Sequence, residues 1–368
     1  MARLGLGDAW KCLFANDIDE RKAASYRRAF KGSRELKVCD IARLQTSVLP
    51  GHADLAWASF PCQDLSLAGN GAGLKGERSG LFWQFWRLIE GLRAENRAPK
   101  VVILENVYGA ITSHHGRDMA AICGALANEG YNFAPMVVDA EHFLPHSRPR
   151  LFIVGFTSNL QPPADLVCLG PEAPWHPEAF GYSYDLLDIA ARSAWMWLRI
   201  PLPPARTQRL VDLVEDTPSG VVWHSLFETH RLLSMMTPIN LEKVRAAKRM
   251  KRIMVGAIYK RTRADENGIK RQRAEVRFDD IAGCLRTPSG GSSRQIILIV
   301  EGEKVRSRLL SPREAARLMG IPDSYPLPTR YNDAYHLAGD GVAVPVVSWL
   351  ARFLIEPALL SEKRKAVA

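Results

Sequence analysis

The sequence contains no run of 18 uninterrupted apolar residues, although 47% of its 368 residues are hydrophobic. A membrane-spanning helix needs about 20 consecutive apolar residues, so we expect no membrane span. The first 20 residues also lack the basic start, apolar stretch and cleavage site of a secretory signal. Charged residues make up 24% of the chain, a composition typical of a soluble globular protein with one or two domains.

Closely spaced cysteine pairs are also missing. The six cysteines form no Cys-x-x-Cys motif, and no histidine cluster stands near one at zinc spacing. We therefore expect no disulfide framework and no metal site, and a reducing cytoplasm fits this pattern best. A cysteine in such a protein is usually a small core residue, so a catalytic role needs further support.

Positive charge is present in excess and is concentrated in one segment. The formal net charge is +10, and residues 241–275 hold twelve Lys or Arg against four acids. A solvated basic helix is one interpretation of this segment, and a phosphate-binding surface is the other. The charge alone does not separate these two interpretations.

The first 156 residues alternate strand-like and helix-like segments. Strands are expected at 12–18, 36–38, 54–60, 101–104, 133–138 and 150–156, with helices at 19–30, 79–93 and 117–129. The apolar run Val101–Leu104 is typical of a strand covered on both faces. The alternation predicts an α/β fold with a doubly wound, mostly parallel sheet and a site at the carboxyl ends of its strands.

The alternation stops after Phe156, where proline and turn-forming residues become frequent. Helical patterning returns at Ser311–Met319, where Ser311 and Glu314 make a capping box, and a last helix is expected from Val344 to Phe353. We expect a catalytic domain at 1–156, an inserted smaller recognition domain at 157–305, and a C-terminal segment at 306–368 that returns to the first domain.

Reactive side chains follow two of the predicted strands. Cys62 comes directly after the strand that ends at Phe60, where an exposed thiolate would be a nucleophile. Glu105 follows Val101–Leu104 and suits a general acid if burial raises its pKa. A small core cysteine and a helix-capping glutamate are the alternatives.

Charged residues mark further strand ends. Arg148 and Arg150 are two residues apart on a strand, so both side chains would reach one ligand, although backbone carbonyls are an alternative target. Asp17, Asp19 and Asp40 follow two short strands, where carboxylates accept ribose hydroxyls.

In this order, the segments resemble the motifs of the C5-cytosine DNA methyltransferase family. Pro61-Cys62-Gln63 and Glu105-Asn106-Val107 resemble its nucleophile and acid motifs. The segment 146–150 resembles Gln-x-Arg-x-Arg with His146 in place of Gln, and 339–342 resembles Gly-Asn-x-Val with Asp340 in place of Asn. The segments 15–19, 39–41 and 310–320 are also similar to family motifs.

The resemblance implies transfer of a methyl group from S-adenosylmethionine to C5 of a flipped cytosine in duplex DNA, through a covalent bond to Cys62. Glu105, Arg148 and Arg150 would assist as the other catalytic residues. Cofactor contacts would come from Asp17, Ile18, Asp40, Ile41, Pro61 and Gly341. Residues 157–305 would recognise the DNA, with 287–294 as a contacting loop or a plain turn. A monomer without metal, with a cognate restriction endonuclease as its partner, is the expected context.

The family also has an opening strand and a Phe-x-Gly-x-Gly loop that this sequence lacks. Such a strand lies in the middle of the sheet, so its neighbours are expected to lose backbone partners. One hypothesis is a late start, with roughly 10–20 residues missing. The other is a truncated, inactive relic or DNA-binding pseudoenzyme. A thiol hydrolase using His142 or His146 and a tRNA methyltransferase are further alternatives.

Overall fold

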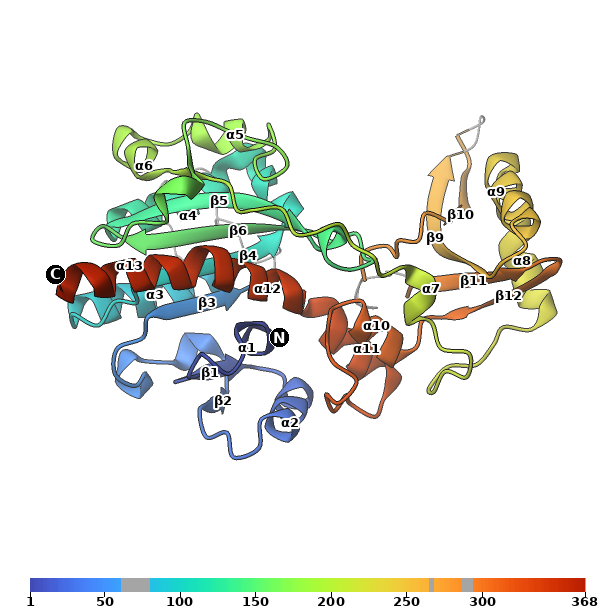
Figure 1. The fold of residues 1–368 in the computed structure, drawn as a ribbon, viewed down its shortest axis with the longest axis horizontal. Coiled ribbons are helices and arrows are strands. Elements are labelled where there is room, and N and C mark those ends of the chain that lie inside the picture. The colour runs from blue at the N-terminus through green and yellow to red at the C-terminus, as the bar shows by residue number, and fades with distance from the viewer. Residues whose placement is uncertain (61–79, 265–267, 286–293, 368) are drawn as a thin grey trace.

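The computed structural model describes residues 1–60, 80–264, 268–285 and 294–367, and consists of two lobes (Figure 1). The larger lobe holds the first 200 residues and the C-terminal helices. The smaller lobe holds a second sheet with helices on one side. The helices of residues 312–340 lie between the two lobes.

The larger lobe contains a four-stranded sheet in the order β3-β4-β6-β5 and a separate parallel pair, β1-β2. In the described chain no strand pairs with both β1 and β3, so the single sheet that we predicted is divided into two. The strands are β1 (Ala15–Asp17), β2 (Leu36–Val38), β3 (Leu55–Ser59), β4 (Val101–Val107), β5 (Tyr131–Asp139) and β6 (Pro149–Thr157).

Strand β6 is the antiparallel member of the predicted, mostly parallel sheet. It runs antiparallel to both β4 and β5, whereas β3 and β4 are parallel. The connection from β5 to β6, residues 140–148, is too short for the crossover that a parallel pair requires. As a result, the first residues of β6 lie at the same sheet edge as the last residues of β4.

Helices cover both faces of this sheet, as the continuous apolar strand predicted. Val102 and Leu104 pack with one core cluster, which includes α3 and α4, and Val101 and Ile103 pack with another, which includes α12 and α13. Helix α2 begins after its predicted cap, Asp19, whose side chain accepts from two backbone N–H groups. The helices of the first half are α1 (Ala2–Leu6), α2 (Glu20–Ala29), α3 (Leu81–Ala94) and α4 (Arg117–Asn128).

Residues 158–200 pack on the larger lobe, so the second lobe starts later than the predicted boundary at 157. Their aromatic side chains bury against the first sheet: Trp195 meets Phe133 of β5 with ring centroids 5.7 Å apart, and Phe180 packs on Trp195. The elements here are β7 (Val167–Cys168), α5 (Phe180–Tyr184), α6 (Ile189–Ala194) and β8 (Trp197–Leu198).

The smaller lobe is an antiparallel sheet in the order β10-β9-β11-β12, with α8 and α9 packed on one face. The sheet extends to Leu309, past the predicted boundary at 305, because β12 is needed to pair with β11. Its elements are α8 (Leu226–Ser234), α9 (Pro238–Arg249), β9 (Met254–Ala264), β10 (Lys270–Arg277), β11 (Ile296–Glu301) and β12 (Lys304–Leu309), preceded by the short α7 (Leu210–Leu213).

The last helices of the C-terminal segment pack on the sheet of the larger lobe. Helix α10 starts with the expected capping box of Ser311 and Glu314. The elements are α10 (Pro312–Arg317), α11 (Tyr331–Asp340), α12 (Val344–Leu350), a π-helical turn (Ala351–Ile355) and α13 (Glu356–Val367). The stretch Tyr331–Ser361 is long and apolar enough for a membrane span, but half of its most apolar window is buried inside the protein, as in core helices.

Candidate functional site

The buried carboxylate of Glu105 lies at the sheet edge where β3, β4 and β6 meet. Glu105 is the fifth residue of β4, so it belongs to the strand itself and stands opposite Ser59 of β3 and Phe152 of β6. It is only 5% exposed, and its Oε1 lies 3.3 Å from Nε of Arg150. The edge therefore presents a carboxylate and a guanidinium as a fixed pair.

The predicted nucleophile, Cys62, and its neighbour Pro61 lie outside the described residues. Strand β3 ends at Ser59, which is three residues before Cys62 in the sequence. The described chain therefore leaves the sheet directly beside Glu105. The parallel pairing of β3 and β4 brings the end of β3, which precedes the predicted nucleophile in the sequence, and Glu105 to one edge.

Arg148 does not share a target with Arg150, contrary to our expectation of one common ligand. Its guanidinium is 2% exposed and donates to the carbonyls of Gly339 and Gly341, at 2.7 and 2.8 Å. Burial lowers the pKa of Arg148 to about 10, which leaves the group charged at neutral pH. Arg148 precedes β6 and therefore points at the C-terminal segment, where it binds backbone carbonyls.

His146 is fully buried and connects three segments. Its Nδ1 lies 2.9 Å from the Leu318 carbonyl, and its Nε2 accepts from the Leu285 N–H at 3.3 Å. Burial lowers the pKa of His146 to about 3, so the ring is neutral and carries its proton on Nδ1. One donor and one acceptor are also what a glutamine amide offers, which explains how histidine serves at this motif position. A ring bound in this way is no base for a thiol.

Four of the predicted cofactor residues, Asp17, Ile18, Asp40 and Ile41, lie at or just after the carboxyl ends of β1 and β2. The two strands pair in parallel with Asp17 opposite Val38, so Asp17 and Asp40 leave the same edge. Ile18 is 69% exposed despite its apolar side chain, and Ile41 begins the turn that Asp40 caps. Partly buried carboxylates beside an exposed apolar side chain fit a ligand with sugar hydroxyls and an adenine ring.

Gly341 and Asp340 end α11 beside this region. A Cβ on Gly341 would come within 1.8 Å of the Met1 sulfur, so a larger residue there would require the flexible Met1 side chain to move. The Asp340 carboxylate, which replaces the family's amide, forms an ion pair with Lys22, whose Nζ lies 2.7 Å away. The added negative charge therefore has a positive partner.

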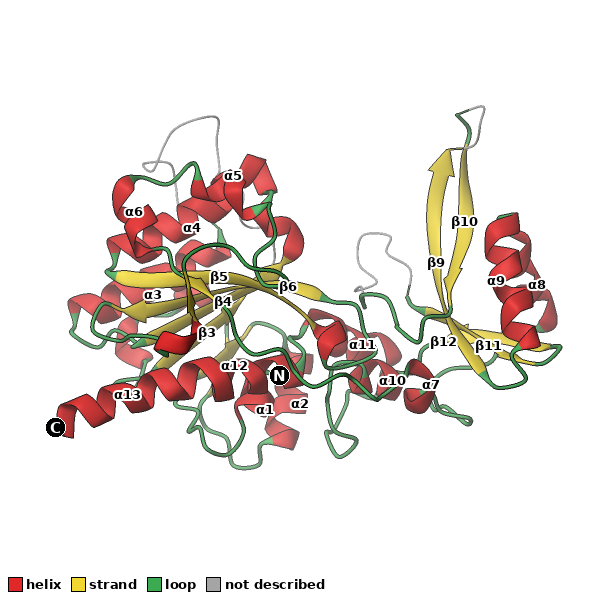
Figure 2. Cartoon of the chain, turned by 45° about the horizontal axis from the view of Figure 1, so that its top comes forward, coloured by secondary structure: helices red, strands yellow, loops and turns green. Residues whose placement is uncertain are grey.

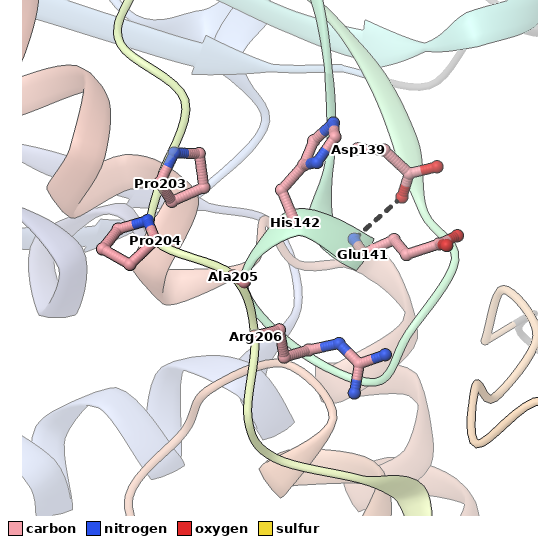
Figure 3. Close-up of a pocket in the computed structure, with 7 residues that line it drawn as sticks. All are labelled: Asp139, Glu141, His142, Pro203, Pro204, Ala205 and Arg206. Carbon is pink, nitrogen blue, oxygen red and sulfur yellow. Dashed lines mark hydrogen bonds between the residues drawn. The ribbon is translucent and has the colours of Figure 1, made fainter.

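One residue that the sequence reasoning missed is Asp139, at the end of β5. Its Oδ1 accepts from the backbone N–H of Arg148 at 2.7 Å and of Glu141 at 3.0 Å. An aspartate at a strand end, before a short connection, is the signal that could have identified it. Figure 3 shows it beside a pocket of about 480 Å³, with His142 and Arg206. The described lining of this pocket contains none of the residues predicted for the methyltransferase site, and the described chain holds no cluster of metal-ligating side chains.

The chain is similar to several known proteins. A family model described as C-5 cytosine-specific DNA methylase matches residues 2–356. The type II methyltransferase M.HpaII of Haemophilus parainfluenzae is 27% identical over 352 residues, covering 94% of this chain and 83% of the relative. M.DsaV of Dactylococcopsis salina is 25% identical over 356 residues, covering 96% and 82%. Among solved structures, the Dnmt2 methyltransferase of S. pombe matches with a TM-score of 0.56 and 17% identity, covering 96% of this chain and 93% of the other.

Proposed function

The chain belongs to the C-5 cytosine-specific DNA methylase family, and we propose that Cys62, Glu105 and Arg150 form its reaction centre. Its activity is the transfer of a methyl group from S-adenosylmethionine to C5 of cytosine in DNA. The observation that carries the residue assignment is the Glu105–Arg150 pair, buried at the edge where the chain leaves β3 toward Cys62.

The chemistry follows from the residue types. Cytosine C5 is a poor nucleophile, and bonding of the Cys62 thiolate to C6 makes C5 electron-rich like an enamine carbon. Glu105 hydrogen-bonds N3 and Arg150 holds O2, which draws electron density from the ring and favours the attack. After C5 gains the methyl group, it loses its proton to a base, and the C6–S bond breaks to release the thiolate. The cytosine has to leave the duplex to reach this buried edge.

S-adenosylmethionine supplies the electrophilic methyl group when it is bound. Asp17 and Asp40 accept hydroxyl or amino donors of the cofactor at the ends of β1 and β2, and Ile18 and Ile41 provide apolar contact. Pro61 and Gly341 complete the set. Arg148 is a positioning residue, because its hydrogen bonds go to Gly339 and Gly341.

The biological setting is proposed from the relatives. We infer that the enzyme acts as a monomer on duplex DNA, with the smaller lobe opposite the reaction centre as the DNA-recognition domain. The curated relatives named above are type II methyltransferases, and we therefore propose a cognate restriction endonuclease as its biological partner. The bacterial cytoplasm is the proposed compartment.

The test is methyl transfer from labelled S-adenosylmethionine to unmethylated genomic DNA by the chain and by its Cys62→Ala variant. Label at cytosine C5 that disappears in the variant supports the assignment. Equal label in both proteins would overturn the role of Cys62. The Cys284→Ala variant is a control for general effects of removing a thiol.

A further inference from the structure

The basic segment of residues 241–275 divides into two structures with opposite surroundings. Its first part is helix α9, with Lys243, Arg245, Lys248 and Arg249. Its second part is the outer half of the β9–β10 hairpin, residues 259–264 and 270–275, which we call the arginine ribbon. It carries Arg261, Arg263, Arg271 and Arg273. The helix thus holds four cations, and the ribbon holds these four arginines together with Lys260 and Lys270.

Each cation of α9 has a partner within the smaller lobe. Arg245 and Arg249 both contact the Glu242 carboxylate, at 3.2 and 2.8 Å. Lys248 lies 2.7 Å from Glu303, and Lys243 donates to the Val276 carbonyl. The helix packs on the sheet through Val244 and Ala247. Its charges are therefore neutralised locally.

The arginine ribbon places like charges directly opposite one another. In the register of the hairpin, Arg261 faces Arg273 and Arg263 faces Arg271, and strand alternation puts all four on one face. Like charges in opposed positions destabilise a strand pair. Glu275 lies 3.6 Å from Arg261 and 3.1 Å from Arg263, so one carboxylate serves two guanidinium groups. Such a face is suited to a polyanion.

The same face of the sheet is turned away from α8 and α9. Nearer its base, this face presents Val255 and Ala257, which pack into the core cluster shared with the larger lobe, whereas Ile258 and Val276 on the other face pack with α8 and α9. Strand β11 pairs with β9 only from Met254 to Ile258 in the described structure, so the ribbon has two strands. Figures 1 and 2 show it projecting beyond the smaller lobe.

We propose that the arginine ribbon binds the sugar-phosphate backbone of duplex DNA through Arg261, Arg263, Arg271 and Arg273, and that α9 makes no DNA contact. The proposal rests on the proposed function in taking DNA as the substrate. A two-stranded ribbon has the width to follow a DNA groove. Arginine forks bind phosphate oxygens in pairs, and each contact releases counterions from the DNA. In the basic segment, the arginine ribbon is then the DNA interface, and α9 is a structural helix.

Two fourfold variants with equal loss of charge test this division. One changes Arg261, Arg263, Arg271 and Arg273 to Gln, and the other changes the four cations of α9 to Gln. Affinity for a duplex fragment of fixed length is measured over a series of salt concentrations. The ribbon variant should reduce the slope of log affinity against log salt by about 3 to 4, since each phosphate contact contributes about 0.9. The α9 variant should keep the wild-type slope and affinity.

Equal losses in both variants, or a ribbon variant that binds like wild type, would overturn the proposal. A third variant, with the ribbon arginines changed to Lys, keeps the charge and should keep the slope; a large loss there would instead indicate reading of base edges. Thermal unfolding of each variant shows whether the α9 changes have damaged the fold. If the fourfold α9 variant is damaged, the double variant Lys248→Gln with Arg249→Gln takes its place in the binding measurement. Binding is measured without methyl transfer, so failure of the proposed activity is detected separately, as an inactive wild type.

Discussion

The reaction edge of the larger lobe and the arginine ribbon of the smaller lobe use the same kind of side chain in opposite ways. At the edge, Arg148 is 2% exposed and Arg150 faces a buried carboxylate, so each guanidinium has a fixed partner. On the ribbon, Arg261 and Arg263 are exposed, and arginines face other arginines across the hairpin.

This difference indicates how each region should respond to change. A buried charge that loses its partner keeps an uncompensated desolvation penalty. The effect of one such substitution on stability or activity is therefore large and specific to that residue. Exposed charges are screened by salt and contribute in small, similar steps. The same arginine-to-neutral change should therefore be severe at the edge and gradual on the ribbon.

The largest expected effect is at Glu105. Glu105→Gln removes the charge that faces Arg150 and the carboxyl proposed to act at cytosine N3, and we expect methyl transfer to fall about 10²- to 10⁴-fold. Single-turnover methyl transfer at saturating DNA measures this. Glu178→Gln, on the exposed surface of the same lobe, is the control and should keep the wild-type rate. A Glu105→Gln enzyme of full activity would contradict the assignment.

The next effect is on stability and concerns Arg148. Arg148→Met leaves the carbonyls of Gly339 and Gly341 without their donor in a buried region, and we expect a loss of about 3 kcal/mol in the free energy of unfolding. Urea denaturation measures it. Arg199→Met removes an arginine whose side chain is 56% exposed and paired with Glu172; it should cost less than about 1 kcal/mol. Equal losses of unfolding free energy in the two variants would contradict the claim that buried arginines matter more for stability than exposed ones.

His146 should give the edge a pH dependence that the ribbon lacks. The folded pKa of about 3 lies below the unfolded value near 6.5. Between these pH values the unfolded chain binds a proton that the folded chain does not. Stability therefore falls as pH decreases from about 6.5 toward 3, by at most about 1.4 kcal/mol per pH unit from this group.

The His146→Gln variant isolates this contribution. It keeps one donor and one acceptor, so at pH 7 it should cost less than about 1 kcal/mol, whereas His146→Leu should cost about 2 kcal/mol. Urea unfolding at pH 7 and pH 5 measures the difference between wild type and His146→Gln. The difference should shift in favour of the glutamine variant at pH 5, and a constant difference would contradict the buried neutral histidine.

Sequence patterns predicted much of the edge and little of the second lobe. The run Val101–Leu104, followed by Glu105, has the composition of a buried strand with a polar end, and the structure has that strand. The target of Arg148 depends on Gly339 and Gly341, which are nearly 200 positions away, so local pattern suggests carbonyl binding only as an alternative. The alternation of Arg261 with Arg263 indicates one strand face. Which face packs on α9 depends on tertiary contacts of Ile258 and Val276, because charge density does not reveal register.

The smallest expected effect is at Asp340. This residue tests whether the cost of losing a charge depends on burial or on nearness to the reaction site. The Lys22–Asp340 pair is in the larger lobe near the proposed cofactor site, but its side chains are 27% and 40% exposed. Asp340→Asn should therefore change the free energy of unfolding by less than about 1 kcal/mol, as for other exposed pairs. High salt should reduce the difference further. Urea unfolding at low and high salt measures it, with Lys22→Gln as the matched partner variant. A loss as large as that of Arg148→Met would mean that nearness to the reaction site, and not burial, decides the cost of losing a charge.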